Sequence, residues 1–169
     1  KVNYEKLYNG RFKLLKKAYK KSNISEKEDF DKFKSENCYW LNDYAMFMAI
    51  KDRFNGQSFD KWAEDIKLRW EYSMEYYQNE LKDEIEFYKF IQYEFYRQWY
   101  KLKKYANENG IKIIGDIPIY VAYDSADVWA HPELFQMDEN GKPVAVAGCP
   151  PDGFSATGQL WGNPLYRWD

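Results

Sequence analysis

The chain has 169 residues, which is enough for one domain with a sizeable core. Its formal net charge of −2 gives no reason to expect affinity for phosphate backbones or anionic lipid, so neither nucleic-acid nor membrane partners are expected. Aromatic residues make up 20% of the chain. That fraction predicts an aromatic core, a surface that stacks on flat ligands or sugars, or both.

Cysteine and histidine usage limits metal and redox chemistry. Cys38 and Cys149 do not form a CxxC motif, and His131 is the single histidine. This pattern argues against a zinc site, and no metal or cofactor is expected. No secretory leader or membrane-length apolar run occurs, so the cysteines are interpreted as reduced thiols of a cytoplasmic protein.

Apolar residues recur at helical spacing through the first two thirds of the chain. Helices are expected over residues 4–21, around Phe30, and up to Asn55-Gly56, a pair that commonly ends a helix. From residue 73 to about 106 the apolar positions advance in steps of three and four. This spacing predicts one long amphipathic helix.

The period changes after this helix. Residues 111–123, "IKIIGDIPIYVAY", are a near-continuous β-branched run, which fits a strand buried on both faces of a parallel sheet. A long helix followed by such a strand is half of a βαβ unit. A parallel strand needs parallel neighbours, and a closed (β/α)₈ barrel takes roughly 250 residues. The chain is therefore expected to be a piece of a larger α/β enzyme.

Two local signals follow the predicted strand. A short helix is expected with Asp124 or Ser125 as its cap. Further on, "FQMDENGKPVAV" places Asn140-Gly141 between apolar residues, which predicts a hairpin turn.

Several carboxylates are candidates for chemistry. Asp116 lies within the apolar strand, where it is either an active-site residue at a barrel mouth or a structural aspartate satisfied by amides or an arginine. Asp124, Asp127 and Asp152 are further acids on loops. Paired carboxylates perform glycoside chemistry, but acids in such positions are also typical of helix caps and turns. His131 is interpreted as a loop residue, because no nucleophile motif accompanies it.

The stretch "GCPPDGFSATGQLWGNP", residues 148–164, combines flexible backbone with aromatic and polar side chains. Phe154 and Trp161 offer flat apolar faces. The polar candidates are Asp152, Ser155, Gln159 and Asn163. Because a sugar ring has an apolar face and a polar rim, this mixture suits a saccharide cleft under a closing loop. The alternative is an Ω-loop pinned by its own aromatics.

Long segments of the chain closely resemble the amylomaltases, which are the 4-alpha-glucanotransferases of the α-amylase clan. The resemblance is carried by "GDIPIYVAYDSADVWAHPELF", by "DENGKPVAVAGCPPDGFSATGQLWGNPLYRWD", and upstream by "YWLNDYAMFMAIKDRF". It implies an α/β fold that is an incomplete fragment of a (β/α)₈ TIM barrel. Residues 1–110 would form a mostly helical insertion. Residues 111–169 would hold one buried parallel barrel strand, a β-hairpin and a substrate-covering loop.

The resemblance also implies an activity. The whole enzyme would transfer α-1,4-glucan segments between maltooligosaccharides by a retaining double displacement, without a cofactor or metal. Asp116 corresponds to the active-site aspartate of the family's barrel strand, and Phe154, Gln159 and Trp161 would contact the glucan from the loop. The family's catalytic carboxylates lie downstream of "NPLYRWD". No catalytic residue is therefore assigned here, and the chain alone is expected to be inactive.

A different class of function stays open. The chain could be a non-catalytic helical module that binds glucan or a protein partner through its aromatic surface. Such a module would be a compact monomer. A barrel fragment would instead expose apolar strand edges and self-associate.

Overall fold

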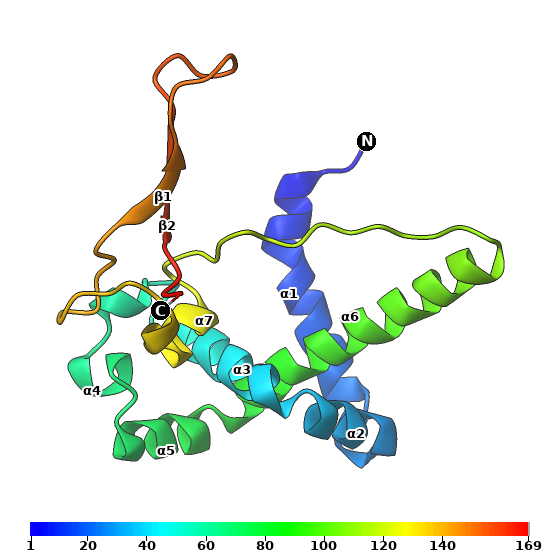
Figure 1. Ribbon diagram of the computed structural model, residues 1–169. Helices are drawn as coiled ribbons and strands as arrows, with labels where there is room; N and C mark the ends of the chain where they lie inside the picture. The colour runs from blue at the N-terminus through cyan, green and yellow to red at the C-terminus, as the bar shows by residue number, and fades with distance from the viewer. Residues whose placement is uncertain (169) are drawn as a thin grey trace. The chain divides into compact units, whose positions relative to one another are not determined.

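The chain is mostly helical in the computed structural model (Figure 1). The structure describes residues 1–168 and, for Tyr8, Asn9 and Ser25, the course of the backbone alone. The chain folds into two compact units, and each unit is built from two separate segments of the chain. None of the described helices combines the length and the apolar character that a membrane crossing requires.

The first unit comprises residues 1–45 and 81–114 and is built from helices. It contains α1 (Tyr4–Lys21), η1 (Ile24–Glu26), α2 (Glu28–Glu36), the start of α3 (Cys38–Arg53) and α6 (Lys82–Glu108). Its core is aromatic, since the rings of Tyr19 and Phe90 lie 5.4 Å apart and α2 inserts the buried Phe30 against α6. The helices predicted over residues 4–21 and around Phe30 are confirmed.

The second unit comprises residues 46–80 and the chain from 115 onward. It contains the rest of α3, η2 (Phe59–Lys61), α4 (Glu64–Lys67), α5 (Glu71–Glu80), α7 (Ala126–Ala130), η3 (Pro132–Leu134), β1 (Val146–Cys149) and β2 (Gln159–Pro164). Trp129 occupies its core, and the indole Nε1 donates a buried hydrogen bond of 3.0 Å to the carbonyl oxygen of Ile66. Ser125 caps α7 by accepting a hydrogen bond from the amide of Val128. Of the two predicted caps, Asp124 and Ser125, it is therefore Ser125 that is confirmed.

The helix predicted over residues 73–106 is two helices, α5 and α6. The break falls at Leu81, whose backbone has left the helical region at φ −106° and ψ 23°. Asp83 and Glu84 follow in the first turn of α6, where acidic side chains stabilise a helix N-terminus. The apolar spacing continues through Leu81, so periodicity alone could not reveal the break.

The buried parallel strand predicted over residues 111–123 does not form among the described residues. The segment is extended, but within the described residues no strand pairs with it. Its apolar side chains are exposed, with Ile114 at 95% and Ile117 at 89%. A strand is held by hydrogen bonds to neighbouring strands, and the described part of the chain supplies none to this segment.

The Asn140-Gly141 turn is present, although the paired segments around it are short. Gly141 has a left-handed φ of +71°, and the Asp138 amide donates to the Lys142 carbonyl at 2.8 Å. A single antiparallel bridge between Met137 and Pro143 closes this turn. The longer hairpin of the second unit is made by β1 and β2, which pair antiparallel.

Candidate functional site

The predicted substrate-covering stretch, residues 148–164, forms most of the β1–β2 hairpin (Figure 1). Gly148 pairs with Leu160, and a Cβ at Gly148 would lie 2.4 Å from the Gln159 carbonyl oxygen. Gly158 has a φ of +73°, and a Cβ there would lie 2.5 Å from the Cys149 carbonyl oxygen. Both glycines are therefore required by the close approach of the two strands at the neck of the hairpin.

Residues 150–158 form the tip, and its shape comes from hydrogen bonds within the tip. Asp152 Oδ1 accepts from the amides of Phe154 and Ser155, each at 2.8 Å. The Asp152 amide donates to the Ser155 carbonyl oxygen at 2.9 Å. The Ser155 hydroxyl donates to the Gly158 carbonyl oxygen at 2.7 Å. Two predicted sugar-binding residues, Asp152 and Ser155, thus direct polar groups into the tip itself.

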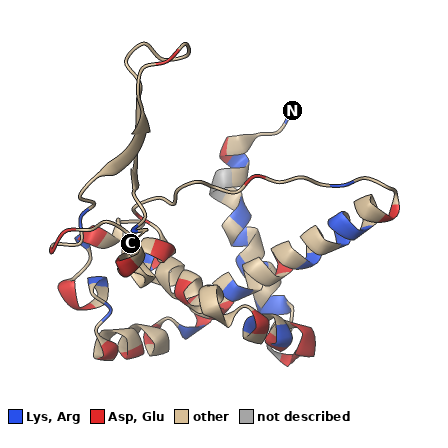
Figure 2. Ribbon diagram, viewed as in Figure 1, with Lys and Arg blue, Asp and Glu red and all other residues tan. Residues whose placement is uncertain are grey.

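Phe154 lies at this tip with its side chain 99% exposed. No aromatic ring packs against it among the described residues, so the alternative of a loop pinned by its own aromatics does not hold for Phe154. The surrounding hairpin carries little charge (Figure 2), since Asp152 is the sole charged residue between Pro143 and Tyr166 in the sequence. The hairpin is therefore nearly uncharged, and its tip carries one fully exposed aromatic ring.

The remaining predicted loop residues lie on β2. Gln159 and Trp161 are two apart on the strand and so share a face, where the Trp161 Nε1 donates to Gln159 Oε1 at 2.9 Å. Asn163 Nδ2 donates to the Val121 carbonyl oxygen at 2.8 Å. Trp161 lies 6.3 Å from the ring of Tyr120. β2 is therefore joined to the end of the extended segment that carries Asp116.

Tyr120 and Tyr166 were not among the predicted site residues. Their rings stack at 6.2 Å with an interplanar angle of 17°, and with Trp161 they form an aromatic group beside the base of the hairpin. A sequence signal for Tyr120 existed, because it lies four residues after Asp116 in the strand-like run. Tyr166 follows the loop and had no comparable signal.

The acids differ in their surroundings. Asp116 is exposed, and within the described residues no hydrogen bond or ion pair to its carboxylate is seen. The structural alternative for Asp116, with amides or an arginine as partners, therefore does not occur in the described chain. Asp124 is paired with Lys51 and accepts from the Phe59 amide, which is a structural role. His131 contacts Glu133 at 3.2 Å within its own loop.

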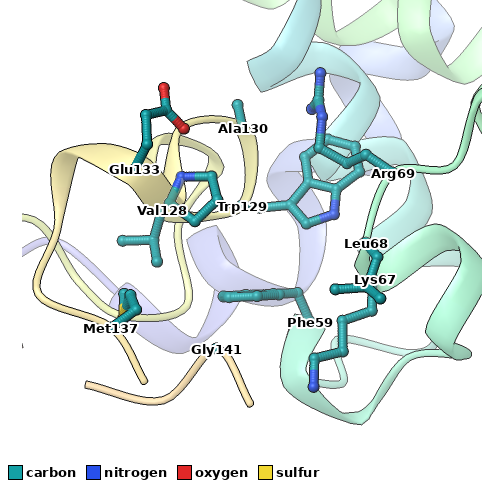
Figure 3. Close-up of a pocket in the computed structure, with 11 residues that line it drawn as sticks. Phe59, Lys67, Leu68, Arg69, Val128, Trp129, Ala130, Glu133, Met137 and Gly141 are labelled. Carbon is teal, nitrogen blue, oxygen red and sulfur yellow. The ribbon is translucent and has the colours of Figure 1, made fainter. Parts of the chain in front are cut away.

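A mostly apolar pocket of about 330 Å³ also lies in the second unit (Figure 3). Phe59, Trp129 and Met137 line it, and the cations beside it are already engaged. The Arg69 guanidinium lies 4.3 Å from the centre of the Trp129 ring, and Lys67 donates to a backbone carbonyl oxygen. None of the predicted site residues lines this pocket, so it is a feature distinct from the hairpin.

Among the described residues, no three His, Cys, Asp or Glu side chains gather into a set that could hold a metal ion.

The comparisons with known proteins agree over the whole chain. The family model described as 4-alpha-glucanotransferase matches residues 1–169. The chain is 51% identical to the 4-alpha-glucanotransferase of Clostridium butyricum over 99% of its own length. It is 47% identical to the Thermus thermophilus protein of the same name over 100% of its length. The structure of the Streptococcus agalactiae amylomaltase in complex with acarbose matches 99% of the chain with a TM-score of 0.91 and 44% identity.

The chain spans about a third of the length of these relatives, covering 34% of the Clostridium protein and 34% of the solved chain. A family match over every residue, together with this structural likeness, decides its membership. The chain belongs to the 4-alpha-glucanotransferase family.

Proposed function

We propose that this chain is part of a 4-alpha-glucanotransferase that transfers α-1,4-glucan segments between maltooligosaccharides by a retaining double displacement. The observation that carries the proposal is the hairpin tip, where Phe154 is 99% exposed on a self-supporting arm. Complete burial of an exposed phenylalanine side chain by a ligand contributes roughly 1.5–3 kcal/mol of favourable free energy. The apolar face of a sugar ring can stack on such a side chain. The names of the relatives support the same substrate class.

Within this proposal the hairpin covers the glucan. Phe154 stacks on a sugar ring, and Trp161 and Gln159 contact the chain from β2. Their existing hydrogen bond fixes the direction of the indole, which is about half exposed beside Tyr120. The exposed carboxylate of Asp116 is proposed to lie in the active site. Asn163 is proposed to act on the glucan through the backbone that it holds.

We further propose that residues 1–110 are a helical part and that residues 111–169 carry a strand of a (β/α)₈ barrel with the substrate-covering hairpin. The exposed isoleucines support this assignment. Ile114 and Ile117 present apolar surface that parallel neighbours would bury. The same exposed surface predicts that the chain by itself self-associates, which sedimentation velocity would detect as species larger than a 20.4 kDa monomer.

We propose that the chain by itself does not turn over glucan. Among the described residues, Asp116 is exposed on the segment joined to the base of the hairpin, and Asp152 is the one acid of the hairpin, where its Oδ1 is engaged by the tip's own amides. Retaining enzymes need two carboxyl groups about 5–5.5 Å apart. Transfer is thus expected only when this chain is joined to the remaining length of a family member.

The test is incubation with maltotriose, followed by chromatography for glucose and longer maltooligosaccharides. The chain by itself should give neither, and the full-length protein should give both. Glucan binding by the chain without any product from the full-length protein would instead support a non-catalytic module. In the full-length protein, Phe154→Ala should raise KM about tenfold. Leu134→Ala, which removes an exposed apolar side chain outside the hairpin, should leave KM unchanged.

A further inference from the structure

Two polar side chains fix the conformation of the hairpin tip around Phe154. We propose that Asp152 and Ser155 are positioning residues, which hold the tip in the shape that presents Phe154 to a glucan, while Phe154 makes the contact. The inference rests on the proposed function, because it assumes that the tip meets a sugar chain. It departs from the expectation that Asp152 and Ser155 themselves bind the hydroxyl groups of the sugar.

The first hold is made by Asp152. One carboxylate oxygen, Oδ1, accepts from the amides of Phe154 and Ser155, two and three residues further along the chain. Both distances are 2.8 Å, which is typical of a charge-assisted hydrogen bond. Since the amide of Phe154 is one of the two donors, the direction of its Cα–Cβ bond is tied to Asp152.

The second hold is made by Ser155. Its hydroxyl donates to the Gly158 carbonyl oxygen at 2.7 Å, and the Gly158 amide returns a bond of 3.2 Å to the Ser155 carbonyl oxygen. That same carbonyl oxygen accepts from the Asp152 amide at 2.9 Å. Phe154 is thus bracketed by restrained residues, although its ring packs against no other described aromatic ring and is 99% exposed.

The chain uses the same device at another turn. Asp138 Oδ1 accepts from the amides of Asn140 at 2.8 Å and Lys142 at 2.9 Å. That turn is not part of the hairpin tip, so the arrangement serves backbone shape without a sugar. By analogy, the carboxylate of Asp152 serves to accept the two backbone amides and so to fix the shape of the tip.

Holding the tip before binding has a consequence for affinity. The tip contains Gly153, around which there is open space, so an unrestrained backbone would sample many conformations. Ordering such a segment during binding lowers affinity, whereas a segment that is already ordered avoids that loss. Removal of either hold should therefore weaken glucan binding even though the ring of Phe154 remains.

The first arm of the test needs no glucan. Amide resonances of Phe154 and Ser155 are recorded in full-length protein that is isotope-labelled at phenylalanine and serine. Asp152→Ala should shift both resonances toward random-coil positions. Asp152→Asn should keep both near their original positions, because its Oδ1 can still accept. Thr157→Ala, which changes an exposed side chain of the same tip, is the matched control and should shift neither.

The second arm measures maltotriose kinetics in the same proteins. Asp152→Ala should raise KM about tenfold with a smaller effect on kcat, and Asp152→Asn should restore KM to within about threefold. Ser155→Ala should raise KM in the same direction, and Ser155→Thr should restore it. The double variant Asp152→Ala with Phe154→Ala should be no worse than Phe154→Ala alone, because one residue acts through the other.

Three results would overturn the proposal. Equal damage from Asp152→Asn and Asp152→Ala would mean that the charge itself contacts the sugar. Additive losses in the double variant would mean that Asp152 and Phe154 act separately. Unshifted amides in Asp152→Ala would mean that the carboxylate does not hold the tip. If Phe154→Ala leaves KM unchanged, the glucan contact of the proposed function fails, and the amide measurement still decides the positioning role on its own.

Discussion

Asn163 donates a hydrogen bond of 2.8 Å from its side-chain amide to the carbonyl oxygen of Val121, across 42 residues of sequence. The bond joins the end of β2 to the extended segment that carries Asp116. The bond is half-buried. A second contact supports it, since Tyr120 precedes Val121 and its ring lies beside that of Trp161, which is on β2 with Asn163. The base of the hairpin is thus fixed to the segment that holds the proposed active-site aspartate.

Asn163→Ala removes the donor and leaves the Val121 carbonyl oxygen without its side-chain partner. The expected loss is about 1–2 kcal/mol in the free energy of unfolding, measured by urea denaturation. Asn107→Ala, an exposed asparagine near the end of α6, is the matched control and should cause no loss. Equal stability of Asn163→Ala and the unsubstituted chain would show that the bond does not hold the hairpin base.

The pair of Lys51 and Asp124 gives a second prediction. It joins α3 to the chain before α7, and Asp124 also accepts from the Phe59 amide at 3.2 Å. Both side chains are largely covered, so the pair should contribute more than a surface ion pair. Asp124→Ala should cost about 1–3 kcal/mol, because it leaves a lysine and an amide without their acceptor.

Asp124→Asn separates the two contributions of that carboxylate. It keeps an acceptor for the Phe59 amide and removes the charge opposite Lys51. Its loss of stability should be smaller than that of Asp124→Ala, and this loss should shrink as salt is added, because salt screens the ion pair that the unsubstituted chain keeps. A larger loss for the asparagine variant would contradict this division. Guanidinium denaturation is unsuitable because it is itself a salt, so urea is the appropriate denaturant.

The helices were predictable because their apolar spacing and end signals are local. Asn55 and Gly56 both adopt a left-handed φ, and the Gly56 amide bonds back to the Lys51 carbonyl oxygen, as a helix-ending pair should. The break at Leu81 was not predictable, since its apolar side chain fits the period of one continuous helix. Periodicity records which face is buried and carries little information on backbone dihedral angles.

The strand predicted over residues 111–123 does not form among the described residues, and the reason is different. Its β-branched composition describes what the segment would do between neighbouring strands, and composition cannot say whether those strands are present. Within the candidate site, the sequence indicated candidate residues on the hairpin but not the direction of their polar side-chain atoms. Asp152 and Ser155 looked like sugar ligands because their polar atoms suit hydroxyl groups. Only the fold shows that these atoms bond to the tip's own backbone.

The glycines at the hairpin neck give a third prediction. Gly148→Ala would place a methyl group 2.4 Å from a backbone oxygen, and Gly158→Ala would add a similar clash at a φ of +73°. Each should cost about 1–3 kcal/mol or break the strand pairing. Gly153→Ala meets nothing within 4 Å and should be neutral. Thermal unfolding followed by tryptophan fluorescence compares the three, and equal effects at all positions would contradict the close approach of the strands.

The last prediction concerns acid stability and rests on Asp65. The hydroxyl of the buried Ser73 donates to its carboxylate and holds the pKa of Asp65 below its usual range. A carboxyl whose folded-state pKa is lowered binds protons more weakly in the folded protein. Its contribution to stability is therefore complete above the unfolded-state pKa of about 3.9 and is lost as the pH falls through the lower folded-state pKa.

Ser73→Ala removes this contribution, so the unsubstituted chain should be more stable than the variant at neutral pH. The difference should shrink as the pH falls below about 4, because protonation then removes the same interaction from the unsubstituted chain. Urea denaturation at a series of pH values measures this. Ser35→Ala is the control, since its hydroxyl donates to the Lys32 carbonyl oxygen, which does not titrate. A Ser73→Ala difference that stays constant across this range would show that the hydroxyl does not stabilise the ionised carboxylate.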